Sequence, residues 1–210
     1  MPIEDGQWDA TKGKVETLLG DKNNFRIQLI QEHVRGLWKG KKHQGYYTLH
    51  DPSHNEGVEY ALYKLIPIQN DNVPLCASSG KKPLTSYQWF CLLSAAWLHD
   101  VGMLSNILKN DEIKGYKIDD IDKARENHHI RSRDYIHQFA DVLRLSDDER
   151  DDIGTICEYH RRSVNIKKCP TDNNLHLLSA YLRLADGIHI NYERIDDDLF
   201  GLFGSVTNFL

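Results

Sequence analysis

Residues 95–103 read Ala95-Ala96-Trp97-Leu98-His99-Asp100-Val101-Gly102-Met103, which places a histidine and an aspartate side by side at the end of an apolar run. The run extends from Tyr87 to Leu104, carries no other charged residue and predicts a buried helix. Ionisable groups are costly to bury unless they pair with one another or bind a metal ion. Imidazole and carboxylate together form a ligand set for a divalent cation of intermediate softness. We therefore expect further histidine and aspartate ligands from other parts of the chain.

The composition indicates a globular chain of one domain, with or without extensions. Its 210 residues are 40% hydrophobic and 27% charged, and the net charge is −5. This charge gives no general attraction to nucleic acid or to an anionic membrane, although a local basic patch is compatible with it. The longest apolar stretch is interrupted by polar residues, so we expect no membrane span.

The cysteines, Cys76, Cys91, Cys157 and Cys169, are scattered and form no C-x-x-C motif. They predict free thiols in a reducing compartment rather than a disulfide scaffold or a zinc ribbon. The first nine residues lack the basic and apolar regions of a secretory signal. We therefore expect a cytoplasmic location.

Between Ala10 and Trp38, apolar residues recur at steps of three and four, which predicts helices with a break at Gly20-Asp21. A basic, glycine-flanked loop follows at residues 39–45. We interpret this loop as solvated, although a basic loop can also meet phosphate.

A helix start is predicted near Pro52, with Ser53 as the N-cap and Glu56 as its capping-box partner. This start places His54 in the first helical turn, where a surface role and a ligand role both fit. A second pair, His50-Asp51, precedes the proline in a loop. We interpret it either as a pair that does not bind metal or as residues that support the ligands.

Two adjacent histidines lie in the predicted helix over residues 125–143. His128 lies near the apolar stripe of this helix, and His129 is about 100° further round. One of the two can face inward easily.

The next helix carries Ile153, Ile156, Cys157 and His160 on one face, after a capping box at Ser146 and Glu149. A core histidine bonded to the backbone is a plain alternative for His160 taken alone. Asp186 lies on the apolar face of the last predicted helix, over residues 175–190, where an unpaired carboxylate would be costly. No strand alternation is found, so the sequence predicts an all-α fold.

Together, separate helices present a histidine or an aspartate on or beside a buried face. In chain order these residues are His54, His99-Asp100, His128, His160 and Asp186. This order resembles the HD-domain superfamily of metal-dependent phosphohydrolases. The matching motifs are Ser53-His54-Asn55-Glu56-Gly57-Val58, Leu98-His99-Asp100-Val101-Gly102, His128-His129-Ile130-Arg131-Ser132, Glu158-Tyr159-His160 and Leu184-Ala185-Asp186-Gly187-Ile188.

The resemblance implies an HD-domain helical bundle over residues 46–195 with a binuclear metal site in its core. Residues 1–45 would then form an N-terminal helical extension, and residues 196–210 a tail leading into a further domain. The first metal would be held by His54, His99, Asp100 and Asp186. A second would be held by His128 and His160, with Asp100 bridging and His129 as the alternative to His128. The metals implied are Mn, Fe, Ni, Co, Zn or Mg.

Two features concern the subgroup. Met103 replaces a lysine that many family members carry three residues after the doublet aspartate, and a Gly-Tyr-Pro signature is missing, which disfavours a cyclic-dinucleotide phosphodiesterase. The sequence around the motifs is similar to that of bacterial HD modules found beside Hsp90-type ATPase domains in proteins of stress or antiviral defence. A fused or partner ATPase module is therefore an expected partner, and a homo-oligomer is another.

The resemblance also implies a mechanism in which a metal-bridged hydroxide attacks a nucleotide phosphate ester or anhydride. The catalytic residues would be Asp100, His99, Arg161 and Arg131, and the substrate contacts Arg125, Arg162 and Arg194. Surface salt bridging is the plain alternative for each arginine. His33 and His50 are further candidates, as proton donors to the leaving group.

Two other functions remain open from the sequence. An HD-type nuclease or cyclic-nucleotide phosphodiesterase would use a basic channel from residues 39–42, 81–82 and 167–168. A non-catalytic regulatory or interaction module would keep the metal site as a sensor or scaffold. We favour a hydrolase of free nucleotides because the net charge is negative.

Overall fold

The computed structural model describes residues 6–39, 52–66, 83–104, 107–108, 112–113, 116–117 and 121–188. The α-helices of this part are α1 (Gly6–Trp38), α2 (Pro52–Leu65), α3 (Ser86–Leu98), α4 (Ile121–Gln138), α5 (Asp147–Tyr159) and α6 (Leu175–Ile188). Short 3₁₀ helices lie at η1 (Val101–Met103), η2 (Ile166–Lys168) and η3 (Asp172–Asn174). A two-residue pair, β1 (Glu112–Ile113) and β2 (Tyr116–Lys117), is antiparallel. The prediction of an all-α helical bundle is therefore confirmed.

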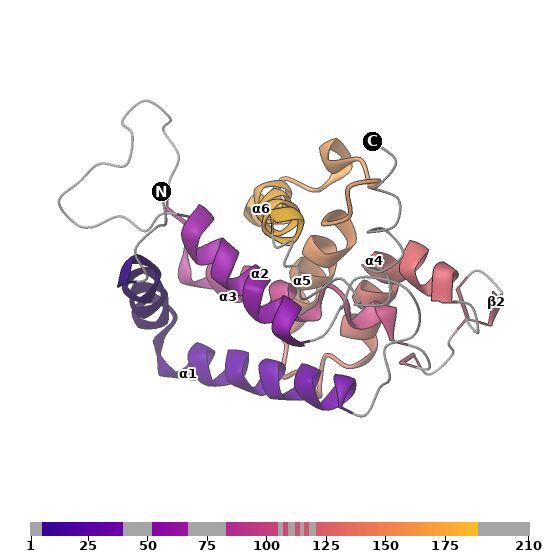
Figure 1. Ribbon diagram of the computed structural model, residues 1–210, viewed down its shortest axis with the longest axis horizontal. Helices are drawn as coiled ribbons and strands as arrows, with labels where there is room; N and C mark the ends of the chain where they lie inside the picture. The colour runs from indigo at the N-terminus through magenta and orange to yellow at the C-terminus, as the bar shows by residue number, and fades with distance from the viewer. Residues whose placement is uncertain are drawn as a thin grey trace, which may run out of the picture.

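Helix α3 is the centre of the bundle and packs against α1, α2, α5 and α6 (Figure 1). Residues 88–98 are all buried, as a helix that is apolar on every side requires. A capping box between Thr85 and Gln88 begins this helix.

The sequence predicts that this helix extends to Leu104, but α3 ends at Leu98 with His99 as its C-cap. The chain then turns through Asp100 into η1. The reason is a tertiary contact, because the amide of Gly102 bonds to Ser132 Oγ on α4 at 2.9 Å instead of continuing the helix.

Helix α1 consists of two helical segments, because Gly20 has φ 70° and ψ 167°. This confirms the predicted break, and a glycine adopts a positive φ without a steric penalty. Both segments contribute to the core, through Val15 and Leu19 before the break and Ile30 and Val34 after it. The expected N-terminal extension therefore packs on the same core as the other helices.

The predicted start of α2 is wrong by one position. The helix begins at Pro52, whose fixed φ suits the first helical position, and Ser53 lies within the helix and is exposed. Glu56 consequently pairs with Arg35 of α1 at 3.0 Å rather than with an N-cap. The capping box predicted at Ser146 and Glu149 is confirmed.

Three cysteines of the described part, Cys91, Cys157 and Cys169, are buried free thiols, as predicted, and Cys76 lies outside it. None of the helices in the described ranges combines the length and apolar character needed to cross a membrane.

Candidate metal centre

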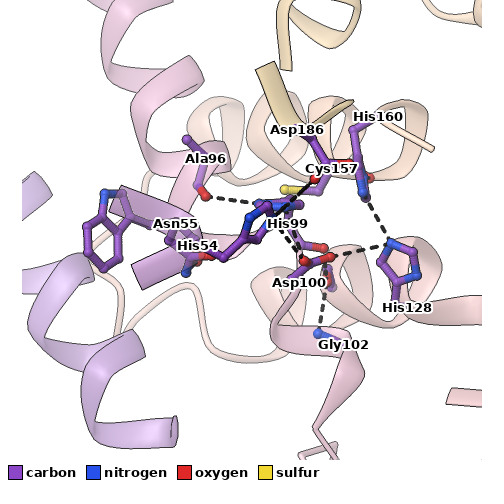
Figure 2. Close-up of polar contacts among 12 residues, drawn as sticks. His54, Asn55, Ala96, His99, Asp100, Gly102, His128, Cys157, His160 and Asp186 are labelled. Carbon is purple, nitrogen blue, oxygen red and sulfur yellow. Dashed lines mark hydrogen bonds and ion pairs between the residues drawn. The ribbon is translucent and has the colours of Figure 1, made fainter. Parts of the chain in front are cut away.

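The six predicted ligands come together from five helices or the residues that directly follow them (Figure 2). They lie in the first turn of α2 (His54), after α3 (His99 and Asp100), on α4 (His128), after α5 (His160) and in the last turn of α6 (Asp186). All are buried except Asp186, whose side chain is 31% exposed. Amphipathic patterning contributes to this arrangement, because His54 and His128 lie on the buried faces of α2 and α4.

Three of the imidazoles are oriented by the backbone of their own chain segment. Each imidazole donates the hydrogen on its Nδ1 to the carbonyl three residues earlier. The bonds run from His99 to Ala96 at 2.9 Å, from His128 to Arg125 at 2.6 Å and from His160 to Cys157 at 2.5 Å. A neutral imidazole with Nδ1 protonated has a lone pair on Nε2. These bonds therefore direct three lone pairs toward the centre of the cluster.

The first group of ligand atoms consists of His54, His99, Asp100 and Asp186. His54 Nε2 lies 3.1 Å from Asp186 Oδ1 and 3.5 Å from Asp100 Oδ2. His99 Nε2 lies 3.3 Å from the same Asp100 oxygen and 3.9 Å from Asp186 Oδ1. These separations suit donor atoms around one divalent ion, whose bonds are about 2.0–2.2 Å long.

The second group uses the other oxygen of Asp100. Oδ1 lies 3.5 Å from His128 Nε2, which is 3.2 Å from His160 Nε2. With both Nδ1 atoms donating to carbonyls, a neutral pair has no proton to place between these nitrogens. A cation between them satisfies both lone pairs, so the donor set fits a metal ion of the kind that imidazole and carboxylate bind.

The histidine pKa values differ between the two groups of donor atoms. Burial lowers the pKa of His99, but the carboxylates of Asp100 and Asp186 outweigh burial and raise it to about 9. Burial, with the charges of His99 and His128, lowers the pKa of His160 to about 3. Burial also raises the pKa of Asp186, but its bond from His54 and the charge of His99 hold that pKa below its usual range. The carboxylate of Asp186 is therefore ionised near neutral pH, as a metal ligand must be.

The family model described as HD-CE matches residues 45–206. This chain belongs to the HD-CE family. The match covers most of the chain and confirms the HD-type domain expected from the ordered motifs. Comparison with curated proteins and with solved structures gave no match. The subgroup beside ATPase modules, and its link to defence, stay predictions.

Asn55 positions the two ligands from α2 and α3 in this HD-CE domain. It is buried, and its side-chain amide donates to Trp97 O at 3.0 Å, which fixes the first turn of α2 against the end of α3. Glu59 strengthens the same contact by accepting from Trp97 Nε1 at 2.6 Å, and Tyr63 of α2 donates to the same carboxylate at 2.9 Å. His54 and His99 are thereby held with their Nε2 atoms 3.3 Å apart.

Arg131, which we expected to contact substrate, has a different place. Its side chain is fully buried and donates to the carbonyls of Gly102 at 2.7 Å and Leu104 at 2.6 Å. Ser132 adds a bond to His99 O at 2.6 Å. The guanidinium therefore holds the segment that follows Asp100 against α4 and is not open to a ligand.

A second arginine, Arg183 of α6, was not singled out by the sequence. It donates to the carbonyls of Tyr159 at 2.7 Å, His160 at 3.1 Å and Val164 at 3.0 Å. It thereby supplies donors to the orphan carbonyls at the end of α5 and fixes the turn that carries His160. No periodicity marks such a residue, because its partners are backbone atoms of a distant segment.

The other predicted residues differ in exposure, and some lie outside the described part. Arg161 is half-buried, whereas Arg125 and Arg162 are exposed. His33 contacts Tyr135 Oη at 2.6 Å, between α1 and α4. Beyond the described residues lie His50-Asp51, Arg194, residues 40–42 and 81–82 of the expected basic channel, and the tail at 196–210.

The structure also separates the adjacent histidines. His128 reaches Asp100 and His160, whereas no contact within the described residues joins His129 to Asp100. His129 is buried, and burial with the positive charges of His128, Arg161 and Arg133 lowers its pKa to about 4. It is therefore neutral near pH 7.

Proposed function

We propose that this HD-CE chain is a metal-dependent phosphohydrolase that acts on nucleotide phosphate ester or anhydride bonds. The observation that carries the proposal is the orientation of Asp100. Its Oδ2 lies near His54 and His99, and its Oδ1 near His128. One carboxylate thus serves two groups of donors, the arrangement that a pair of bridged metal ions requires.

The residues that would hold the ions are His54, His99, Asp100 and Asp186 for one, and Asp100, His128 and His160 for the other. When bound, two divalent cations supply a water of lowered pKa and polarise phosphate oxygens. Number and identity of the ions are part of the proposal, since histidine and aspartate sites take several divalent metals.

The chain's own residues perform the remaining tasks. The bonds from Nδ1 to carbonyls keep three imidazoles aimed inward, so that little reorganisation is needed when ligands bind. Arg161 follows His160 directly and offers a positive charge to a phosphoryl group. We keep Arg125 and Arg162 as proposed contacts at the exposed margin. The net charge of −5 favours a free nucleotide over a polymer.

The test combines elemental analysis with a phosphate-release screen on nucleotides and short oligonucleotides, supplemented with Mn, Ni or Co. We expect about two metal ions per chain, in line with two-metal hydrolases. Asp100→Asn should lose both metal and hydrolysis. Asp151→Asn is the matched control, because Asp151 is exposed on α5 and pairs with Arg150.

A metal-loaded chain that releases phosphate from no nucleotide or oligonucleotide would refute the hydrolase and favour a regulatory module. Hydrolysis confined to oligonucleotides, with salt-sensitive binding, would replace the free nucleotide by nucleic acid.

A further inference from the structure

The second segment of α1 carries two polar residues that reach the helices beside the first group of ligands. Ile30 and Val34 are buried on one face of this segment, and Gln31 and Arg35 lie four residues apart on the face beside it. Within the described part of the chain, the side chains of Gln31 and Arg35 make their contacts outside α1 with α2 and α3. Because α1 precedes residues 45–206, these contacts reach the matched HD-CE region from outside it.

Glu59 joins three helices at one carboxylate. Its Oε2 accepts from Trp97 Nε1 on α3 at 2.6 Å and from Gln31 Nε2 on α1 at 3.1 Å. Its Oε1 accepts from Tyr63 Oη of α2 at 2.9 Å. Hydrogen bonds to an ionised acceptor are stronger than neutral ones. The carboxylate of Glu59 therefore fixes the indole of Trp97 to α1 and α2 together.

Arg35 contacts the same two helices. Its guanidinium carbon lies 4.8 Å from the centroid of the Trp97 ring, and its Nη2 donates to Glu56 on α2 at 3.0 Å. Glu56 comes two residues after His54, and Trp97 comes two residues before His99. One side chain of α1 therefore touches a close neighbour of each of two proposed ligands.

The backbone of Trp97 connects its indole with the proposed ligands. Trp97 O accepts from Asn55 Nδ2 at 3.0 Å, and Asn55 follows His54 directly. The Trp97 side chain is in a close-packed interior with 1% exposure, so the ring and its backbone shift together. Such a shift changes the 3.3 Å separation between His54 Nε2 and His99 Nε2. Metal–ligand distances tolerate deviations of only about 0.2 Å, so this separation affects the affinity for the first ion.

We propose that Arg35 and Glu59 are positioning residues that act through Trp97 on the affinity of the first ion, which makes α1 a support of the metal centre. The inference rests on the metal binding of the proposed function and not on its hydrolysis. The effect is confined to one ion, because the side-chain contacts described for Arg35 and Glu59 lie on α1, α2 and α3. The second ion would be held by His128 of α4 and by His160 after α5.

The experiment is a calorimetric titration of the full chain with Co²⁺ after a chelator has removed its own metal. A His128→Ala background isolates the first ion, and a His54→Ala background isolates the second. In the first background, the double variant Gln31→Ala with Arg35→Gln should weaken Co²⁺ binding about tenfold, at the lower end of the loss seen when a support of a metal ligand is removed. In the second background it should leave Co²⁺ binding unchanged. Glu59→Gln leaves one acceptor oxygen instead of two and should act in the same direction.

The double variant Asn23→Ala with Arg26→Gln is the matched control. It also removes an amide and a guanidinium from α1, and Arg26 likewise lies over an aromatic ring of α3, with its guanidinium carbon 4.2 Å from the Phe90 centroid, and pairs with Glu149. Phe90 lies more than two helical turns before His99. The control should therefore keep the wild-type affinity for the first ion, even where it lowers the free energy of unfolding in a urea titration.

Arg35→Lys keeps a cation for the ring of Trp97 and should recover part of the affinity that Arg35→Gln loses. It also serves if the double variant on α1 folds poorly, as judged by circular dichroism. Wild-type affinity for the first ion in the Arg35 and Glu59 variants would overturn the inference and leave the proposed function standing.

Three other outcomes are decisive. Equal weakening in the Arg26 control, or equal weakening of the second ion, would overturn the inference, because the effect would then be one of general stability. A wild-type chain that binds no Co²⁺ would refute the inference and the proposed function together. Weakening confined to the first ion, in a chain that hydrolyses no substrate, would support the inference and refute the hydrolase.

Discussion

Gly102 is the position where the smallest change should do the most damage to the centre. A Cβ at this residue would lie 2.1 Å from His128 O, 2.7 Å from Ser132 N and 2.8 Å from Arg131 Cβ. The first two are backbone atoms and cannot rotate away. Gly102→Ala must therefore separate η1 from α4 by about 0.9 Å before the nearest contact reaches 3.0 Å, below which real Cβ contacts are essentially absent.

That separation acts on the second group of ligands. Asp100 lies two residues before Gly102, and its Oδ1 is 3.5 Å from His128 Nε2 on the helix that must move. Metal–ligand distances tolerate deviations of only about 0.2 Å, so the affinity for the second ion should fall about 10- to 100-fold. The first ion should be affected less, because it shares Asp100 but none of its four ligands lies on α4.

The stability should fall as well. Overpacking costs about 1–3 kcal/mol, and the hydrogen bond from Gly102 N to Ser132 Oγ adds about 1 kcal/mol if it breaks. The two together lower Tm by roughly 5–15 °C in a chain of this size. Metal content after dialysis and thermal unfolding measure the two effects.

Gly36→Ala is the control, because a Cβ there meets no atom within 4 Å. It should leave the metal content unchanged. A Gly102→Ala variant with wild-type metal content and wild-type Tm would show that η1 and α4 are not packed as described, and the argument for the second ion would be refuted.

Three further predictions concern the supports of the site and the packing of α1. Ser132→Ala removes the hydroxyl between His99 O and Gly102 N and should lower the free energy of unfolding by about 1–3 kcal/mol in a urea titration, whereas a loss near zero would contradict the buried bonds. Arg183→Met leaves the carbonyls after α5 without a donor and should loosen metal bound at His160, seen as faster metal loss to a chelator; equal rates would contradict this role. Arg26→Met removes the partner that, against the opposing effect of burial, lowers the pKa of Glu149 below its ordinary 4.5. A carboxyl whose pKa is lowered in the folded state stabilises the protein above its unfolded-state pKa, and this stability is lost as the pH falls. The wild type should therefore lose more stability below pH 4.5 than the variant. Equal losses in urea titrations would show that this pair contributes nothing.

The helices and the placement of their polar residues could be predicted because both depend on local sequence. The positions of Ile153, Ile156 and Cys157 place His160 on a buried face, and the same reasoning applies to Asp186. The break at Gly20 is predicted by the conformational freedom of glycine. Each of these features depends on residues that are only a few positions apart in the sequence.

What could not be predicted depends on contacts between distant segments. By residue type alone, Arg131 is a candidate for a substrate contact. Only its bonds to the carbonyls of Gly102 and Leu104 show that it holds the backbone after Asp100 in place. The end of α3 at Leu98 is set by Ser132, which is far away in the chain. Asn55 is likewise an ordinary polar residue until Trp97 O lies beside it.

The bonds from Nδ1 to the carbonyl three residues earlier have a consequence for how such centres can be built. A short helical segment that ends in histidine carries its own orienting acceptor, so its imidazole keeps its direction wherever the helix is placed. The difficult step in transplanting this centre into another helical scaffold is therefore the spacing of the helices, and a designer could leave the connecting loops free in length and sequence.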